Sequence, residues 1–178
     1  MQDILASQFS KNIHFGCELF PKISDDRKKA ATFYTQDSTA EFLSRLVITE
    51  NDLDDHQWKD EEIFKTLKIA DLACGIGTLL RAGFRRAMAI RNKFLKQHEG
   101  YQSDEEREED IHNDAMQNGL LGLDISPIAA HLTSSSLVQL GNPYPYPESQ
   151  IAYLNVGTEK GLTGSLEYLD TTEEPAKT

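Results

Sequence analysis

The stretch Ile69-Ala70-Asp71-Leu72-Ala73-Cys74-Gly75-Ile76-Gly77-Thr78-Leu79-Leu80 decides the fold of this chain. It reads as a short apolar strand, an acidic residue and a Gly-x-Gly turn that opens directly into a helix. Such a turn brings backbone N–H groups and a helix N-terminus next to a bound ligand, with the carboxylate of Asp71 beside them. Leu80 stands where a dinucleotide-binding turn has its third glycine, and no Gly-Lys-Ser/Thr follows as in a P-loop. The pattern therefore favours a ligand with an amino group near the strand end and no phosphate chain.

The rest of the chain predicts alternating strands and helices. Ser126 and Pro127 are typical of a helix start, and Leu140-Gly141 is typical of a helix end. The expected elements, in order, are a strand at Leu67–Leu72, a helix from Thr78 to about Gln97, a strand at Gly119–Leu123, the helix from Ser126, and a strand at Ile151–Val156. This order predicts an α/β fold with a parallel sheet and right-handed crossovers. Ligands bind at the carboxyl ends of such strands, so Asp71 and Asp124 are expected to face one crevice.

Three other segments have their own expectations. Residues 1–30 are predicted to form an N-terminal helical segment, with Ile4, Leu5, Phe9 and Ile13 near one face. Ser38-Thr39-Ala40-Glu41 has a capping-box pattern and predicts a helix start. Asn51 to Glu62 is acidic and predicts a solvated connection anchored by Trp58.

An acidic insertion is expected at about residues 100–118. The run Asp104-Glu105-Glu106-Arg107-Glu108-Glu109-Asp110 favours a solvated helix extension or a mobile insertion over a partner-binding loop, because charge runs are commonly exposed.

Composition limits the classes of function. The 178 residues hold 29 acidic and 18 basic side chains, a formal net charge of −11, so the chain alone is expected to bind the polyanion DNA poorly. No apolar run approaches transmembrane length and the N-terminus lacks a signal-peptide pattern, which predicts a cytoplasmic protein without a membrane segment. Cys17 and Cys74 are not expected to form a disulfide, and the five histidines lack metal-ligand spacing.

Three segments together resemble a known family. Asp71-Leu72-Ala73-Cys74-Gly75-Ile76-Gly77-Thr78-Leu79-Leu80 resembles the D-P-A-C-G-S-G-x-F/L-L motif of N6-adenine DNA methyltransferases, above all the modification subunits of type I restriction-modification systems. Upstream, Phe33-Tyr34-Thr35-Gln36 resembles the F/Y-Y-T-P segment of that family. Downstream, Gly122-Leu123-Asp124-Ile125-Ser126-Pro127-Ile128-Ala129 resembles its G-x-D-I-x-P-x-A segment. The cofactor of the family, S-adenosyl-L-methionine, has an amino group and no phosphate chain.

The resemblance implies a Rossmann-like, S-adenosylmethionine-dependent methyltransferase fold over residues 31–178, as a partial cofactor-binding domain. Asp71 would lie near the methionine amino end, Asp124 would accept hydrogen bonds from the ribose hydroxyls, and Ile125 would offer an apolar face to the adenine. Gly75 and Gly77 would let the backbone approach the ligand. The full set of cofactor-binding residues that the motifs imply is Tyr34, Thr35, Asp71, Ala73, Gly75, Gly77, Thr78, Asp124 and Ile125.

The sequence departs from the family at several positions. Leu72 stands for the usual Pro, Ile76 for the usual Ser, and Gln36 for the Pro of the Tyr-Thr-Pro segment. No N-P-P-Y/F catalytic segment is found; Asn142-Pro143-Tyr144 lacks the second proline and lies in an expected loop. Gly164-Ser165-Leu166-Glu167-Tyr168-Leu169 resembles a stretch upstream of that segment in some relatives.

The expectation is therefore the cofactor-binding portion of a DNA adenine-N6 methyltransferase that transfers nothing alone. DNA would be bound only by the complete enzyme, through a further domain or a specificity subunit. A partial sheet also predicts an exposed edge, which a homodimer would cover.

Alternatives stay open at this point. The chain could be a non-catalytic interaction module, a methyltransferase half completed by a partner, or a methyltransferase for a small molecule or protein. The two glycines could serve only a tight turn, Asp124 only a helix cap, and Tyr34 only as a hydrophobic anchor. Cys74 is expected to be a packed side chain and not a nucleophile. Arg81, Arg85 and Arg86 are expected to form a solvated helix face that pairs with neighbouring acids, in preference to a phosphate contact.

Overall fold

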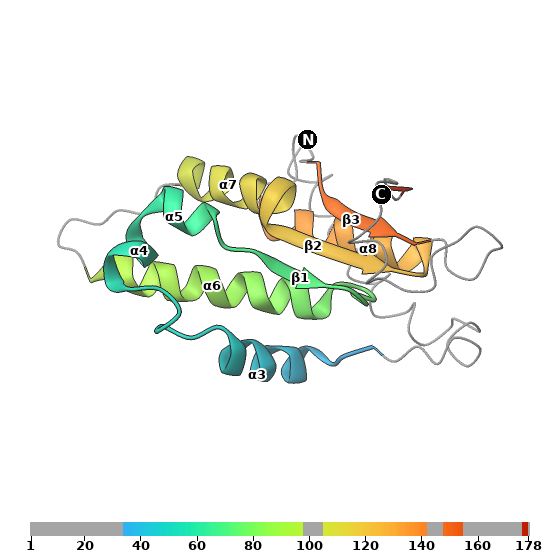
Figure 1. Ribbon diagram of the computed structural model, residues 1–178, viewed down its shortest axis with the longest axis horizontal. Coiled ribbons are helices and arrows are strands. Elements are labelled where there is room, and N and C mark those ends of the chain that lie inside the picture. Colours follow the sequence, from blue (N-terminus) through green and yellow to red (C-terminus); the bar gives the residue numbers. More distant parts are fainter. Residues whose placement is uncertain (1–33, 98–104, 142–147, 155–175, 178) are drawn as a thin grey trace, which may run out of the picture.

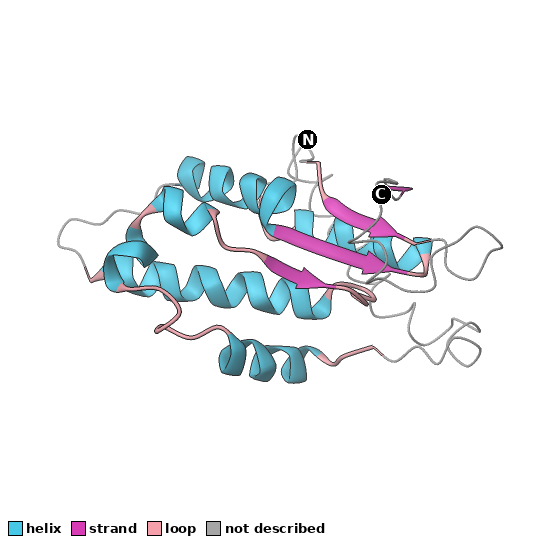
Figure 2. Ribbon diagram, in the orientation of Figure 1, coloured by secondary structure: helices cyan, strands magenta, loops and turns pink. Residues whose placement is uncertain are grey.

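The computed structural model describes residues 34–97, 105–141, 148–154 and 176–177, which form an α/β fold (Figures 1 and 2). Three parallel strands lie side by side in the order β1 (Ile69–Asp71), β2 (Leu120–Asp124) and β3 (Gln150–Tyr153). β4 (Ala176–Lys177) pairs with β3 in the antiparallel direction. Helices α6 (Thr78–Lys96) and α8 (Pro127–Val138) connect the parallel strands and pack against each other. The parallel sheet flanked by helices that the sequence predicts is therefore confirmed.

The elements begin and end close to their predicted positions. β1 lies within Leu67–Leu72, and α6 starts at Thr78 as expected. The hydroxyl of Ser126 accepts the Ala129 N–H at 3.3 Å, with Pro127 in the first turn of α8. α8 ends at Val138, two residues before the predicted Leu140-Gly141. The predicted 1–30 helical segment and the loop at 142–147 lie outside the described residues.

The core has a main cluster between the sheet and the two connecting helices. α6 lies close over β2 because Gly122 has no side chain: a Cβ there would lie 2.8 Å from Ile151 Cδ1 and 2.9 Å from Leu80 Cδ1. The buried members of this cluster are Cys74, Leu80, Phe84, Met116, Leu120, Ala130, Leu137, Val138 and Ile151. This packing fixes the carboxyl ends of β1 and β2 relative to the start of α6.

The connection at 51–62 is solvated and anchored by Trp58, as predicted. It forms two short helices, α4 (Asp55–Lys59) and α5 (Glu61–Lys65), and Trp58 of α4 is completely buried. Asp54 and Asp60 look like loop residues in the sequence, but their side chains cap these helices. The Trp58 indole donates to the Glu50 carbonyl oxygen at 2.9 Å, which satisfies its one polar atom.

The predicted capping box at Ser38-Thr39-Ala40-Glu41 is wrong. Helix α3 (Asp37–Val47) begins before it, at Asp37, and the cap residue Gln36 makes no side-chain cap hydrogen bond. Asp37 in the first turn pairs instead with Arg81 of α6 at 3.1 Å. This ion pair confirms that Arg81 pairs with a neighbouring acid.

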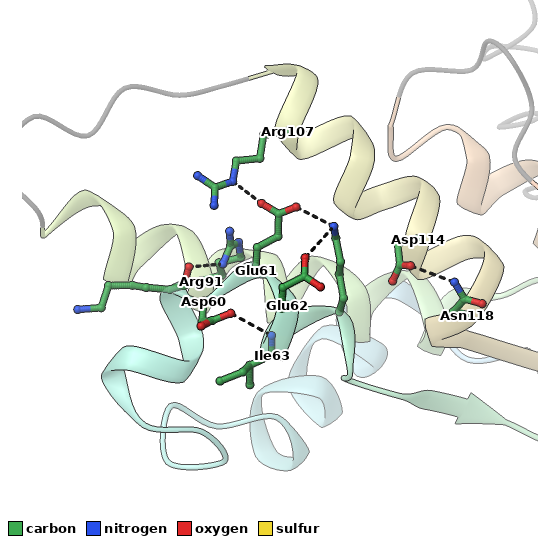
Figure 3. A network of polar contacts seen from close by, with 10 residues as sticks. Asp60, Glu61, Glu62, Ile63, Arg91, Arg107, Asp114 and Asn118 are labelled. Carbon is green, nitrogen blue, oxygen red and sulfur yellow. Dashed lines mark hydrogen bonds and ion pairs between the residues drawn. The ribbon is translucent and has the colours of Figure 1, made fainter.

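The acidic run is helical where the structure describes it. Helix α7 (Glu105–Asp114) buries Ile111 and His112 and leaves Glu106 and Asp110 exposed, and the π-helical turn η1 (Ala115–Gly119) leads from it into β2. Figure 3 shows how α7 is tied to α5: Arg107 bonds the Glu61 carboxylate, which also accepts from Lys65 at 2.7 Å. From residue 105 on, this segment is a helix with one docked side and one solvated side.

Two absences apply to the described part of the chain. None of its helices combines the length and the apolar character that a membrane span requires. None of its groups of His, Cys, Asp and Glu side chains is arranged to hold a metal ion.

Candidate functional site

The turn between β1 and α6 is held in a left-handed backbone conformation at two glycines. Gly75 has φ +56° and Gly77 has φ +78°, values that residues with a side chain rarely adopt. The Gly77 N–H donates to the Cys74 carbonyl at 2.8 Å, and the Cys74 N–H donates to Leu123 of β2 at 2.8 Å. The turn therefore lies across the carboxyl end of β2, where Asp124 follows.

Asp124 connects the two strand ends. One carboxylate oxygen accepts the Gly75 N–H at 2.8 Å, and the other accepts the Ser126 N–H at 2.7 Å. Burial raises the pKa of the Asp124 carboxyl, these two N–H groups oppose the rise, and the nearby Asp71 adds to it. An ionised carboxylate offers about four acceptor positions, so Asp124 keeps acceptor capacity beyond these two bonds. Asp124 is therefore not only a helix-capping residue before α8, because it also bonds the glycine turn after β1.

Asp71 ends β1 next to the same turn. Its Oδ1 accepts the Ala73 N–H at 3.1 Å. Burial raises the pKa of the Asp71 carboxyl, and the hydrogen bond from Ala73 opposes the rise. Asp71 and Asp124 thus lie half-buried at adjacent strand ends, and the charge of Asp71 disfavours the ionised form of Asp124.

A hollow of about 30 Å³ opens beside this turn. Six of the nine residues predicted from the motifs line it: Tyr34, Thr35, Asp71, Ala73, Gly75 and Thr78. Cys74, Ile76 and Leu79 complete its wall. The Tyr34 ring covers the turn so closely that a Cβ on Gly75 would lie 3.1 Å from Tyr34 Cδ1. The segment before α3 and the turn after β1 thus meet in one place.

The other three predicted residues do not line this hollow. Asp124 lies next to it, where its carboxylate accepts the Gly75 N–H. Ile125 is 53% exposed at the start of the connection to α8. Gly77 faces α8, where a Cβ would lie 2.7 Å from Thr133 Cγ2. The packing of α8 against the turn therefore requires glycine at position 77, independently of any ligand.

The sequence analysis did not identify Thr133, which fixes the turn from the side of α8. The fully buried hydroxyl of Thr133 donates to the Gly75 carbonyl at 2.8 Å. No local pattern marks it, because its partner lies 58 residues earlier in the chain.

Cys74 is packed under the turn, as the sequence predicts. Its thiol is buried, and burial raises its pKa to about 12. A thiol with such a pKa holds almost no thiolate at neutral pH.

A larger hollow, about 780 Å³, lies away from the strand ends, between α6, α7 and the end of α8. Arg85, Asn92, Glu108 and His112 are among its lining residues, and none of the motif residues is. It is an open surface depression, so the smaller hollow at the glycine turn remains the candidate site.

Comparison with models of known protein families finds none that matches this chain. A search of curated proteins likewise finds no significant match.

Proposed function

We propose that this chain is the S-adenosylmethionine-binding portion of a DNA adenine-N6 methyltransferase of the restriction-modification type, with a Rossmann-like methyltransferase fold. One observation carries the proposal. Two half-buried carboxyl groups, Asp71 and Asp124, end adjacent parallel strands and flank a left-handed glycine turn at the start of α6. The motif resemblance of the three segments supports the same ligand.

The charge of the cofactor fits the charge of the site. S-adenosylmethionine has a positively charged sulfonium group and an ammonium group. The methyl group on the sulfonium is the group that is transferred. Burial raises the pKa of both carboxyl groups, because each ionised form loses hydration. A cationic ligand stabilises the ionised forms and so recovers that cost as binding free energy.

In this proposal, different residues bind different parts of the ligand. The hollow has room for a small group only, so it would take the amino-acid end beside Asp71, Tyr34 and Thr35. The ribose would bond the remaining acceptor positions of Asp124. The adenine would lie against the exposed Ile125, which offers an apolar face outside the hollow.

The proposal concerns binding and not transfer by this chain. Methyl transfer from a sulfonium to an amine needs positioning more than acid–base chemistry. That agrees with a site without a reactive thiol, since the pKa of Cys74 is about 12. No Asn-Pro-Pro-aromatic segment, which would hold the target adenine, occurs in the 178 residues. We therefore expect cofactor binding and no methylation of DNA by the purified chain.

The test is equilibrium dialysis with radiolabelled S-adenosylmethionine, with ATP and NAD as competitors. The proposal predicts saturable binding that excess S-adenosylhomocysteine displaces and the phosphate-bearing ligands do not. Asp124→Ala should weaken it at least tenfold, with the fold checked by circular dichroism because Asp124 also bonds Gly75. Displacement by ATP or NAD would indicate a nucleotide site and contradict the proposal, and absence of saturable binding would favour a non-catalytic interaction module.

A further inference from the structure

The hollow at the glycine turn offers acidic groups to a ligand but no basic side chain among its described residues. The amino-acid end of S-adenosylmethionine has an ammonium group and a carboxylate on the same carbon atom. Asp71 in the wall of the hollow suits the ammonium group, and Asp124 next to it adds a second negative charge. None of the described lining residues is basic, so the carboxylate of the ligand needs a cation from outside the lining.

Arg81 of α6 lies close to two walls of the hollow. It directly follows the motif that ends at Leu80, and it lies one helical turn after Thr78, which lines the hollow. Its Nη2 donates to Asp37 Oδ1 at 3.1 Å, at the start of α3, which packs alongside α6 (Figure 1). Asp37 follows Thr35, another lining residue, by two positions. Arg81 therefore bridges the two segments that contribute Thr35 and Thr78 to the wall.

Most of the hydrogen-bonding capacity of Arg81 is unused in the described part of the chain. A guanidinium has five N–H donors, and the bond to Asp37 uses one of them. Nε of Arg81 is buried and has no hydrogen-bond partner among the residues that the structure describes. The Asp37 side chain is 76% exposed, against 17% for Arg81. Ion pairs with a solvated partner contribute little to stability, so exchanging Asp37 for another carboxylate costs little.

We propose that Arg81 selects ligands with an α-carboxylate at this site: its guanidinium turns from Asp37 to the methionine carboxylate, while Asp71 binds the ammonium group. This inference rests on the proposed function, because it assigns one more group of S-adenosylmethionine. A guanidinium fits a carboxylate through two parallel N–H bonds. The start of α6 adds to the attraction, since Gly77 supplies no side-chain cap and the first turn has no acidic residue.

A pair of ligands isolates the contribution of the carboxylate. Calorimetric titration of the full chain uses S-adenosylhomocysteine and its decarboxylated analogue, which keeps the ammonium group, the ribose and the adenine. The wild type should bind S-adenosylhomocysteine at least tenfold more tightly than the analogue. Arg81→Met should lose this preference and should bind the analogue as the wild type does, because only the interaction with the carboxylate is removed.

Two further variants separate carboxylate binding from a structural role of the ion pair. Asp37→Asn breaks the ion pair and leaves the guanidinium free for the ligand, so it should bind S-adenosylhomocysteine at least as tightly as the wild type. Arg85→Met removes another arginine of α6, one that lines the larger hollow, and should keep the tenfold preference. Arg81→Gln replaces Arg81→Met if circular dichroism shows that the methionine variant does not fold.

Three results would overturn the inference. Equal affinity of the wild type for the two ligands would do so and would leave the proposed function standing. Equal weakening of both ligands in Arg81→Met, or weaker binding of S-adenosylhomocysteine by Asp37→Asn, would show that Arg81 only ties α3 to α6. No binding of either ligand by the folded wild type would overturn this inference and the proposed function together.

Discussion

Replacing Gly77 by alanine tests whether the glycine turn is held by its packing against α8. Gly77 has φ +78°, and an alanine Cβ there would lie 2.7 Å from Thr133 Cγ2. The left-handed conformation costs a residue with a side chain about 1–2 kcal/mol. The overlap with Thr133 adds about 1–3 kcal/mol, because the surroundings must shift to admit the methyl group. We expect Gly77→Ala to lower the free energy of unfolding by about 2–5 kcal/mol, a large part of a typical total.

Urea denaturation followed by circular dichroism measures this loss, with Gly83→Ala as the matched control. Gly83 lies inside α6 without a positive φ, and the nearest atom to its Cβ position is 3.4 Å away, an ordinary contact. Alanine is favoured over glycine in a helix by about 1 kcal/mol, so Gly83→Ala should leave stability unchanged or raise it.

A double mutant separates the overlap from the backbone strain. Thr133→Ser removes Cγ2 and keeps the hydroxyl that donates to the Gly75 carbonyl. In the Thr133→Ser background, Gly77→Ala should cost about 1–2 kcal/mol less than in the wild type. A cost no larger than that of Gly83→Ala, or the same cost in both backgrounds, would refute the reasoning.

Three further predictions follow from the titrating groups. Burial raises the pKa of Asp71 above its usual 3.8. The ionised carboxylate therefore lowers the free energy of unfolding once the pH rises through the folded-state pKa, whereas below pH 3.8 the neutral group has no such cost. Asp71→Asn should therefore raise the urea midpoint at pH 7 and not at pH 3. An unchanged midpoint at pH 7 would contradict this. Burial lowers the pKa of His112 below 6.5, so the unfolded chain takes up protons first as the pH falls, and the wild type should lose more stability than His112→Gln between pH 7 and pH 5. Parallel curves for the two proteins would argue against it. Burial raises the pKa of the Cys74 thiol to about 12, so in a Cys17→Ser variant Cys74 should react with a thiol reagent at pH 8 only after unfolding. Rapid labelling of the folded chain would show that the thiol is not packed as described.

The local patterns of the sequence predicted the part of the fold that carries the site. An acid before a Gly-x-Gly turn and a Ser-Pro pair before a helix each fix a strand end and a helix start within a few residues. The order of these elements then fixes a parallel sheet, so Asp71 and Asp124 come to adjacent strand ends without knowledge of any distant contact.

The sequence patterns missed details of helix starts and one contact between distant elements. Asp54 and Asp60 are typical of loops in the sequence, but they cap the short helices α4 and α5, whose Trp58 and Phe64 are buried. The capping-box pattern at Ser38 is not used, because α3 begins one residue earlier, at Asp37, with Gln36 as its cap residue. Thr133 had no signal at all, since its partner lies in a different element.

Calorimetric titration with S-adenosylhomocysteine tests the central claim most directly. It compares the wild type with Asp71→Asn, which keeps an acceptor for the Ala73 N–H, and with Asp114→Asn, a carboxylate that bonds Asn118 away from the site. The account predicts saturable binding by the wild type and by Asp114→Asn, and binding at least tenfold weaker by Asp71→Asn. Equal affinity for all three proteins, or no binding by the folded wild type, would contradict it.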